Sequence, residues 1–291
     1  MFEGVLPAII TPFQRDHSMA LDTEGLRSNI RYLLDQGVHG IVPCGSTGES
    51  ATLTFEEHEK VIEIAIDEVN GSVPVLAGTG SNNTAEAVRL TKAAKDAGAD
   101  GVLVISPYYN KPNRSGLIKH YTILADIGIP VVMYNVPGRT GQNLLPDLVT
   151  ELAKHPDIVG IKEASGNISQ ISEILEGTMD EDFLVISGDD NMTFPILALG
   201  GSGVISVAAN VMPARMAAMY EAFCEGDFQT ALDIHYELAP LFRAMFIDTN
   251  PIPVKKAVEL MGMAAGPVRL PLDQLDGTKT ARLSEVLKSY D

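Results

Sequence analysis

Cysteine is scarce in this chain of 291 residues, and tryptophan is missing altogether. Two cysteines, Cys44 and Cys224, do not make the disulfide framework of a small secreted domain, so we expect a protein of the reducing cytoplasm. No stretch approaches the roughly 18 consecutive apolar residues of a membrane-spanning helix, and we expect no membrane association. Residues 1–4 lack the basic region of a signal peptide, which argues against export.

Basic residues are also few in comparison with acidic ones. The chain has 21 lysine and arginine residues against 38 aspartate and glutamate residues, which gives a formal net charge of −17. This surplus of negative charge repels nucleic acids and anionic lipid surfaces, so the sequence predicts neither as a partner. A site for an anionic ligand must therefore supply its own positive side chain.

What the chain does have is a regular alternation of strand-like and helix-like segments. Runs rich in valine and isoleucine predict strands that are buried on both faces, as in a parallel sheet. The predicted strands are residues 5–11, 40–44, 73–78, 101–106, 130–135, 158–164, 183–187 and 204–208. The predicted helices that follow them are residues 23–36, 55–69, 84–97, 116–126, 146–154, 168–175, 192–199 and 214–224. These eight units favour a (β/α)8 TIM barrel over residues 1–225, with a helical region, residues 226–291, packed on it.

A doubly wound, Rossmann-like sheet is the alternative fold. Such a sheet is expected to carry a Gly-x-Gly-x-x-Gly turn after an early strand. The nearest candidate begins at Gly78-Thr79-Gly80 and lacks the third glycine. We therefore favour the barrel, in which catalytic groups lie at the carboxyl ends of the strands and in the loops that follow.

Lys162 is the most unusual residue of the predicted strands, because it interrupts the apolar run 158–164. An ammonium group is rarely buried without a partner, and burial favours the neutral amine, which is a nucleophile toward carbonyl groups. Gly160 and Ala164 share the face of Lys162 and are expected to leave space for a small molecule. A lysine that reaches solvent from the strand end is the alternative that this segment alone leaves open.

Hydroxyl groups gather in the loops and strand ends around this lysine. Tyr134 ends the neighbouring predicted strand and is a candidate to carry protons to and from a reacting group. Ser46, Thr47 and Tyr109 are candidates to extend such a relay, since each hydroxyl both donates and accepts hydrogen bonds. A tyrosine packed in the core and a plain Gly-Ser-Thr-Gly turn are the simpler explanations of the single motifs.

Two features of these loops suit carboxylates. Gly45 and Gly48 are expected to let backbone N–H groups approach an anion closely. Arg139 offers the planar, two-pronged donor that matches a carboxylate, although a surface arginine is the simpler explanation of that residue alone. The nucleophile, the hydroxyls and the positive charge all fall on one predicted face of the barrel, which favours a catalytic site.

Two other polar groups have structural explanations. Asp189 and Asp190 resemble the start of a metal site, but no third ligand has convincing spacing, so we expect a helix N-cap and no metal. His58 lies in a helical stretch rich in glutamate and is predicted to be a surface residue.

Seven motifs occur in order along the chain: Gly45-Ser-Thr-Gly-Glu-Ser50, Pro107-Tyr-Tyr-Asn-Lys-Pro112, Tyr134-Asn-Val-Pro-Gly-Arg-Thr-Gly141, Gly160-Ile-Lys-Glu-Ala164, Ser187-Gly-Asp-Asp190, Gly203-Val-Ile-Ser-Val207 and Asn250-Pro-Ile-Pro-Val-Lys255. With them the chain closely resembles the 4-hydroxy-tetrahydrodipicolinate synthase (dihydrodipicolinate synthase) family of the class I pyruvate-aldolase superfamily, over essentially its whole length. The first motif and the lysine mark the superfamily, whereas the third and the last are more specific to the synthase branch.

The resemblance implies a lyase of lysine biosynthesis through diaminopimelate that needs no cofactor. Lys162 would form a Schiff base with pyruvate, and the resulting enamine would add to the aldehyde of L-aspartate 4-semialdehyde to give 4-hydroxy-tetrahydrodipicolinate. In the family pattern one residue donates and accepts protons, others complete the relay, and others hold the substrates. These roles fall here on Tyr134 for proton transfer, on Thr47, Tyr109 and Ser46 for the relay, on Thr47, the Ile205 backbone and Gly188 for substrate binding, and on Arg139 for the semialdehyde carboxylate.

The resemblance also implies partners. Family members are usually homotetramers built as dimers of dimers, in which the residue that corresponds to Tyr109 is contributed across a tight interface. Lysine-inhibited relatives bind lysine at that interface, and the matching residues are Ser50, Ala51, His58, Asn82, Glu86 and Tyr108. Phe55 departs from this pattern, because a polar residue often occupies its position.

A second departure keeps an alternative function open. The family commonly has two threonines where this chain has Ser46-Thr47, and the sialic-acid lyase relatives share the serine. The alternative is therefore another class I pyruvate-dependent aldolase, acting on a 2-keto-3-deoxy sugar acid or on sialic acid. Arg139 and Tyr109 favour the synthase. A non-catalytic binding barrel is the rival from a different class, and it predicts a damaged site.

Overall fold

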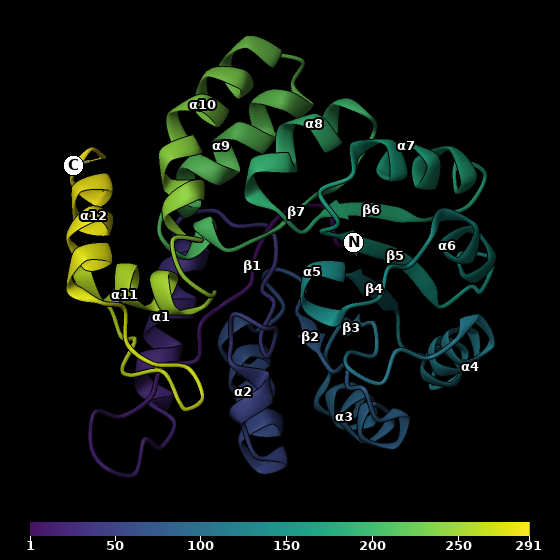
Figure 1. Cartoon of the computed structure of the whole chain (residues 1–291), viewed down its shortest axis with the longest axis horizontal. Helices are drawn as coiled ribbons and strands as arrows, with labels where there is room; N and C mark the ends of the chain where they lie inside the picture. The colour runs from purple at the N-terminus through teal and green to yellow at the C-terminus, as the bar shows by residue number, and fades with distance from the viewer. Residues whose placement is uncertain (291) are drawn as a thin grey trace.

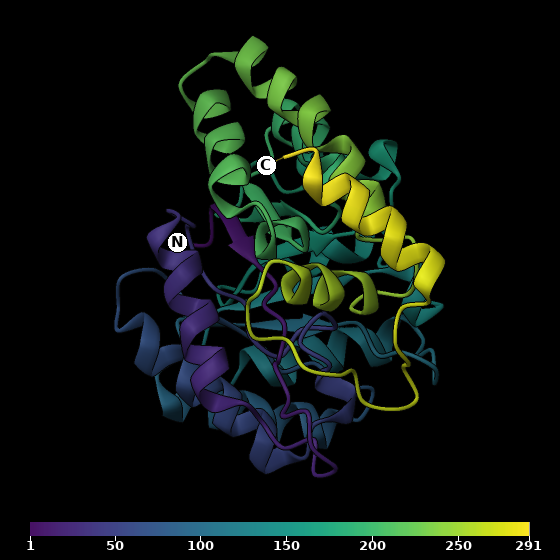
Figure 2. The ribbon, with the colours of Figure 1, turned by 90° about the vertical axis from the view of Figure 1, so that its left-hand side faces the viewer.

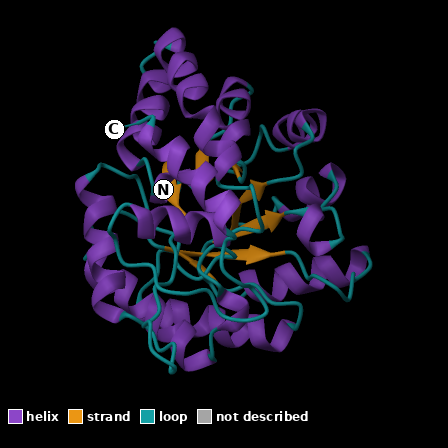
Figure 3. Ribbon diagram, turned by 60° about the vertical axis from the view of Figure 1, so that its left-hand side comes forward, coloured by secondary structure: helices purple, strands orange, loops and turns teal. Residues whose placement is uncertain are grey.

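The computed structural model describes residues 1–290, in which parallel strands lie at the centre and helices surround them (Figures 1 and 3). The seven strands are hydrogen-bonded in the order β1-β7-β6-β5-β4-β3-β2, and every neighbouring pair is parallel. Their bounds are Gly4–Pro7 (β1), Leu76–Gly78 (β2), Gly101–Ile105 (β3), Val131–Asn135 (β4), Ile158–Glu163 (β5), Leu184–Ser187 (β6) and Gly203–Ser206 (β7).

An eighth extended segment closes the sheet into a barrel between β1 and β2. Val42 forms a parallel bridge with Ala8, and Ile41 forms one with Val75. The Val42 N–H donates to the Pro7 carbonyl at 2.9 Å, and the Ile41 N–H donates to the Pro74 carbonyl at 3.0 Å. The segment forms bridges rather than a continuous ladder, because Pro7 and Pro74 on the neighbouring segments have no N–H to donate. The predicted strand 40–44 is thus present, and the predicted (β/α)8 barrel is confirmed.

The helices run antiparallel to the strands on the outside of the barrel (Figure 1). Side-chain caps begin most of them; Thr54 and Glu57, for example, form a reciprocal capping box at the start of α2. The helices of the barrel are Thr23–Asp35 (α1), Phe55–Val69 (α2), Thr84–Ala97 (α3), Arg114–Ala125 (α4), Pro137–Thr140 (α5), Pro146–Leu152 (α6), Ile168–Gly177 (α7), Thr193–Ala198 (α8) and Pro213–Cys224 (α9). Three short 3-10 helices lie in the loops: Ser50–Thr52 (η1), Asp190–Met192 (η2) and Ala208–Asn210 (η3).

Three further helices follow the barrel: Phe228–Ala244 (α10), Ile252–Leu260 (α11) and Gly277–Lys288 (α12). Helix α10 packs on α9, and α12 packs on both α10 and α11, so these helices share one apolar core (Figure 2). Residues between α11 and α12 return to the barrel, where Arg269 approaches the loop after Val42. No helix within residues 1–290 is both long and apolar enough to cross a membrane.

The alternation of side chains along the strands separates two apolar cores. Odd and even positions of a strand point to opposite faces, so one set fills the barrel interior and the other packs under the helices. The interior set is Phe2, Leu6, Ala8, Val42, Leu76, Leu103, Val132, Tyr134, Val136, Ile186 and Ile205. On β5, Ile161 belongs to the outer core, which leaves Lys162 on the inner face.

Candidate active site

Lys162 lies inside the barrel beside Tyr134. The two residues are partners in the register between β5 and β4, and the Lys162 Nζ lies 4.3 Å from the centre of the Tyr134 ring. Lys162 is only 6% exposed, so its amine is enclosed by the barrel rather than extended to solvent. The alternative of a strand-end lysine that reaches water is therefore wrong.

Burial makes the Lys162 amine a better nucleophile at neutral pH. The pKa of Lys162 is lowered to about 7, mainly by loss of hydration; the negative charge of Asp190 opposes this shift, and the guanidinium of Arg139 adds to it. The uncharged form is consequently more abundant near neutral pH than it is for an exposed lysine. An uncharged amine is the form that attacks a carbonyl carbon.

Tyr134 keeps its proton under the same conditions. Burial raises the pKa of its phenol to about 12, and Arg139 opposes this shift. The hydroxyl therefore enters a reaction as a proton donor, next to an amine that is ready to attack.

Arg139 lines the cavity of the site. It lies on α5, a short helix directly after β4, and its Nη2 donates to the Asn250 carbonyl at 3.0 Å. Arg139, Tyr134, Ser46 and Asn250 line one cavity of about 650 Å³. In a chain of negative net charge, a site for an anionic ligand needs a positive side chain of its own, and Arg139 supplies one at the cavity wall.

Thr47 is buried in the loop after the eighth extended segment. Its Oγ1 accepts a hydrogen bond from Asn250 Nδ2 at 3.1 Å, which leaves the hydroxyl hydrogen free to donate. The Gly48 N–H donates to the Gly45 carbonyl at 3.1 Å within the loop. This turn uses the Gly48 N–H, so the prediction that backbone N–H groups of this loop approach an anion applies to other residues of the loop.

The space beside Lys162 comes from Gly188. A Cβ atom on this residue would lie 3.0 Å from Lys162 Cε, so a larger side chain would press on the lysine. A Cβ on Gly160 would instead lie 2.7 Å from the Leu184 carbonyl oxygen. The expectation that Gly160 leaves room for a substrate is thus wrong, since this glycine permits close packing of β5 on β6.

Tyr109 and Ile205 are among the predicted site residues that do not line this cavity. Tyr109 is 89% exposed and adopts a positive φ of 72°. Ile205 is buried on β7, on the inner face of the barrel.

Asp190 is a charged group near Lys162 to which sequence reasoning assigned no chemical role. The N-cap prediction holds for Asp189, which accepts from the Asn191 N–H at 3.0 Å. It is wrong for Asp190, which is buried and accepts from Ser206 Oγ at 2.5 Å and from the N–H groups of Val207 and Ala208 at 3.1 and 2.9 Å. Burial raises the pKa of Asp190 to about 6. The carboxylate therefore fixes the end of β7 and supplies negative charge close to Lys162.

His58 is also placed differently from the prediction. It is buried in α2, and its Nε2 lies 2.7 Å from the Gly78 carbonyl oxygen, while burial lowers its pKa. The predicted surface position is wrong because the inner face of α2 turns His58 toward the barrel. His58 lines the same cavity as Ser50, Ala51, Glu86 and Tyr108, whereas Asn82 donates from Nδ2 to the Tyr108 carbonyl at 3.1 Å.

Phe55 lines this cavity as well. The guanidinium carbon of Arg89 lies 4.1 Å from the centre of its ring. Among the described residues, no group of three His, Cys, Asp or Glu side chains is arranged to hold a metal ion.

Known proteins share both the sequence and the fold. The chain is 71% identical over 291 residues to a protein of Methanosphaerula palustris and 75% identical over 290 residues to one of Methanoculleus marisnigri, both called 4-hydroxy-tetrahydrodipicolinate synthase. Each comparison covers 100% of both chains.

Solved structures of dihydrodipicolinate synthases share this fold. Dihydrodipicolinate synthase from Aquifex aeolicus is 48% identical with a TM-score of 0.96, and the alignment covers 99% of this chain and 98% of that one. The Cyanidioschyzon merolae protein, solved with lysine bound, is 38% identical with a TM-score of 0.95 and the same coverage. The sequence profile of the Dihydrodipicolinate synthetase family matches residues 1–290. The chain therefore belongs to the Dihydrodipicolinate synthetase family.

Proposed function

We propose that this chain condenses pyruvate with L-aspartate 4-semialdehyde to 4-hydroxy-tetrahydrodipicolinate, the step toward diaminopimelate and lysine, through a Schiff base on Lys162. The observation that carries the proposal is the buried Lys162 amine, whose pKa is lowered to about 7, beside a protonated Tyr134. The names of the relatives at 71% and 75% identity support the same reaction.

The first half of the reaction activates pyruvate. The uncharged Lys162 Nζ attacks the ketone carbon, the carbonyl oxygen gains a proton, and the resulting hydroxyl leaves as water with a second proton. Tyr134 supplies and retrieves these protons, and the Thr47 hydroxyl next to Asn250 passes them on. Loss of a methyl proton from the imine then gives an enamine, whose terminal carbon is a nucleophile.

The second half forms the carbon–carbon bond. The enamine carbon attacks the aldehyde carbon of the semialdehyde, the aldehyde oxygen takes up a proton, and the imine is restored. The amino group of the semialdehyde then attacks the imine carbon and displaces the Lys162 amine, which closes the ring. Arg139 holds the semialdehyde carboxylate at the cavity mouth, and this charge distinguishes the proposed substrate from a neutral sugar chain.

We further propose a homotetramer in the cytoplasm. In it, Tyr109 reaches the active site of a second copy, because a tyrosine that is 89% exposed at a strained φ of 72° has no role at its own site. The exposed free thiol of Cys224 fits a reducing compartment. The alternative aldolase on a sugar acid is distinguished by a coupled assay with both substrates.

The central test is chemical trapping of the imine. Borohydride reduction in the presence of pyruvate is expected to add one pyruvate-derived group to Lys162, detected by peptide mass spectrometry. The Lys162→Ala variant is expected to show no adduct, and the surface variant Lys154→Ala is expected to be trapped like the wild type. Absence of an adduct on wild-type Lys162 would overturn the proposed mechanism.

The pH dependence of imine formation reports the charge state of Lys162. The rate, measured by quenching with borohydride at low pyruvate, is expected to rise with pH through about 7 and to level off above, because only the uncharged amine attacks. In Asp190→Asn the midpoint is expected to move to lower pH, because the charge that raises the pKa of Lys162 is gone.

Asp189→Asn is the matched control for this experiment, since asparagine caps a helix as well as aspartate does. Its midpoint is expected to stay with the wild type. Equal midpoints in Asp190→Asn and the wild type would show that Asp190 has no electrostatic effect on Lys162.

Arg139→Ala tests recognition of the second substrate. Loss of a charge-assisted hydrogen bond typically costs about 1.5–3 kcal/mol, so KM for the semialdehyde is expected to rise at least about tenfold while pyruvate still traps on Lys162. Steady-state kinetics measure the change. Arg114→Ala removes an exposed arginine that pairs with Asp147 and Glu151, and it is expected to leave both KM values unchanged. A rise confined to the KM for pyruvate contradicts the assignment.

We also propose that lysine binds in the cavity beside His58 and inhibits the enzyme. The polar wall of Ser50, Glu86 and Tyr108 supports this, together with the lysine-bound relative. Millimolar L-lysine is expected to lower the turnover of the wild type, whereas norleucine, which lacks the ε-amine, is expected to have no effect. An inhibition curve that stays flat with lysine rules the regulation out.

A further inference from the structure

The loop that carries Ser46 and Thr47 is bracketed by strained backbone. Cys44 on one side has a φ of 56° and Glu49 on the other has a φ of 54°. Residues other than glycine seldom adopt this left-handed conformation, and they persist in it only where surrounding contacts hold them. Contacts from outside the loop must therefore hold it in this conformation.

Glu49 is held by a buried ion pair. Its carboxylate accepts from Lys255 Nζ at 2.7 Å and from the Arg269 backbone N–H at 2.9 Å. The side chain of Glu49 is 0% exposed and that of Lys255 is 2% exposed. Lys255 Nζ also donates to the carbonyl oxygens of Thr11 at 3.0 Å and Pro267 at 2.7 Å. All three hydrogens of the ammonium thus have acceptors, and both carboxylate oxygens have donors.

The same side of the loop has two more attachments. Thr11 Oγ1 donates to the Gly48 carbonyl at 2.7 Å, and Asn250 Nδ2 donates to Thr47 Oγ1 at 3.1 Å. Lys255 lies on α11, which begins two residues after Asn250. The segment that runs from Asn250 into α11 therefore contacts both the Thr47 hydroxyl and Glu49 at the end of its loop.

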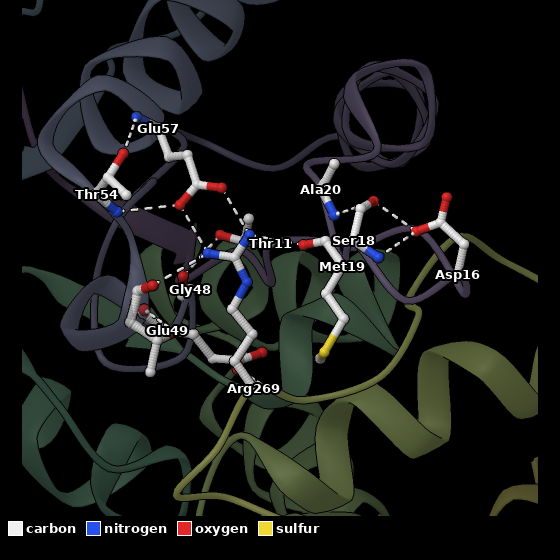
Figure 4. A network of polar contacts seen from close by, with 11 residues as sticks. Thr11, Asp16, Ser18, Met19, Ala20, Gly48, Glu49, Thr54, Glu57 and Arg269 are labelled. Carbon is white, nitrogen blue, oxygen red and sulfur yellow. Dashed lines mark hydrogen bonds and ion pairs between the residues drawn. The ribbon is translucent and has the colours of Figure 1, made fainter.

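Arg269 extends the attachment to the start of α2 (Figure 4). Its guanidinium donates to both carboxylate oxygens of Glu57 at 2.6 and 2.7 Å, to the Met19 carbonyl at 2.6 Å and to the Thr52 carbonyl at 3.0 Å. Figure 4 shows the arginine between Glu57 and Met19, with Glu49 and Gly48 beside it. The loop thus cannot shift without breaking several charged hydrogen bonds at once.

Stability alone does not account for the ion pair. Desolvation of two charges costs about as much as their attraction returns, so an uncharged pair of similar shape is commonly as stable. A fully hydrogen-bonded pair, however, accepts only one geometry, whereas apolar side chains tolerate several. What the pair contributes is therefore a defined position for the loop.

We propose that the Glu49–Lys255 pair is a positioning device for the reaction: it holds loop 45–50 so that the Thr47 hydroxyl is aligned for proton transfer at the pyruvate imine. Both side chains are buried and hydrogen-bonded within the protein, so the pair acts through the loop that it holds. The inference rests on the proposed function of Lys162 and Thr47, and it assigns α11, a helix beyond the barrel, a part in catalysis.

The test replaces the pair with an uncharged one of similar shape, Glu49→Gln with Lys255→Met. The readout is exchange of the pyruvate methyl protons for deuterium, followed by NMR, because this exchange needs only imine and enamine formation. Rates are divided by the amount of Lys162 that borohydride traps, so loss of folded protein does not lower them. We expect a melting temperature close to that of the wild type and an exchange rate at least about tenfold lower, within the range that positioned acid–base groups contribute.

Two comparisons separate positioning from a general structural effect. Thr47→Val is expected to slow exchange similarly, and adding Glu49→Gln and Lys255→Met to Thr47→Val is expected to slow it little further, because the pair acts through that hydroxyl. The control variant Arg215→Met with Glu237→Gln removes a surface ion pair between α9 and α10 and is expected to exchange like the wild type. Glu49→Gln alone, the mildest change, is expected to slow exchange in the same direction.

The outcomes are distinct from those of the proposed function. If wild-type Lys162 forms no adduct, the proposed function fails. If the wild type is trapped and the uncharged pair exchanges at the wild-type rate per trapped lysine, the positioning inference is overturned. The inference is also overturned if Glu49→Gln with Lys255→Met slows exchange by the same factor in the wild type and in Thr47→Val. The pair would then act on the reaction by a route that does not involve the Thr47 hydroxyl. Should the double variant not fold, an unchanged rate in Glu49→Gln overturns it.

Discussion

The alternation of side chains in a closed parallel barrel is the constraint on which the rest of the structure depends. Closure between β1 and β2 through residues 41 and 42 removes every free sheet edge, so half of the strand residues must fill the interior. Lys162 belongs to this inner set and therefore loses most of its hydration. The main cause of the lowered pKa of the amine is thus this loss of hydration, which follows from the strand register.

Two charged residues near the Lys162 amine shift its pKa in opposite directions. Arg139 lowers the pKa of Lys162 and Asp190 raises it, and the two residues follow strands on either side of β5. The arginine also faces the cavity, where it suits an anionic substrate, whereas the aspartate is turned into the protein by its hydrogen bonds to the end of β7. The residues after the two strands that flank β5 therefore adjust the basicity of the nucleophile, and one of them supplies the positive charge that suits an anionic ligand.

The polar contacts outside the barrel have a different purpose. Glu49, Lys255 and Arg269 join segments more than 200 residues apart in the sequence, and they surround the loop that carries Thr47. The helices beyond the barrel are thus tied to the catalytic loop as well as packed on α9. Their apolar core gives stability, and their few buried charges give the loop one position.

The amino-acid sequence by itself determined the eight strand–helix units, the place of Lys162 on an apolar strand and the polar loops after the strands. These features follow from local periodicity and residue type, which act over a few positions. Only the tertiary structure decided that Asp190 is buried under β7, that His58 faces the cavity, that Gly160 serves packing and that Lys255 holds Glu49. Each of these is a contact between segments whose separation in the sequence carries no periodic signal, so the register and closure of the barrel had to be known first.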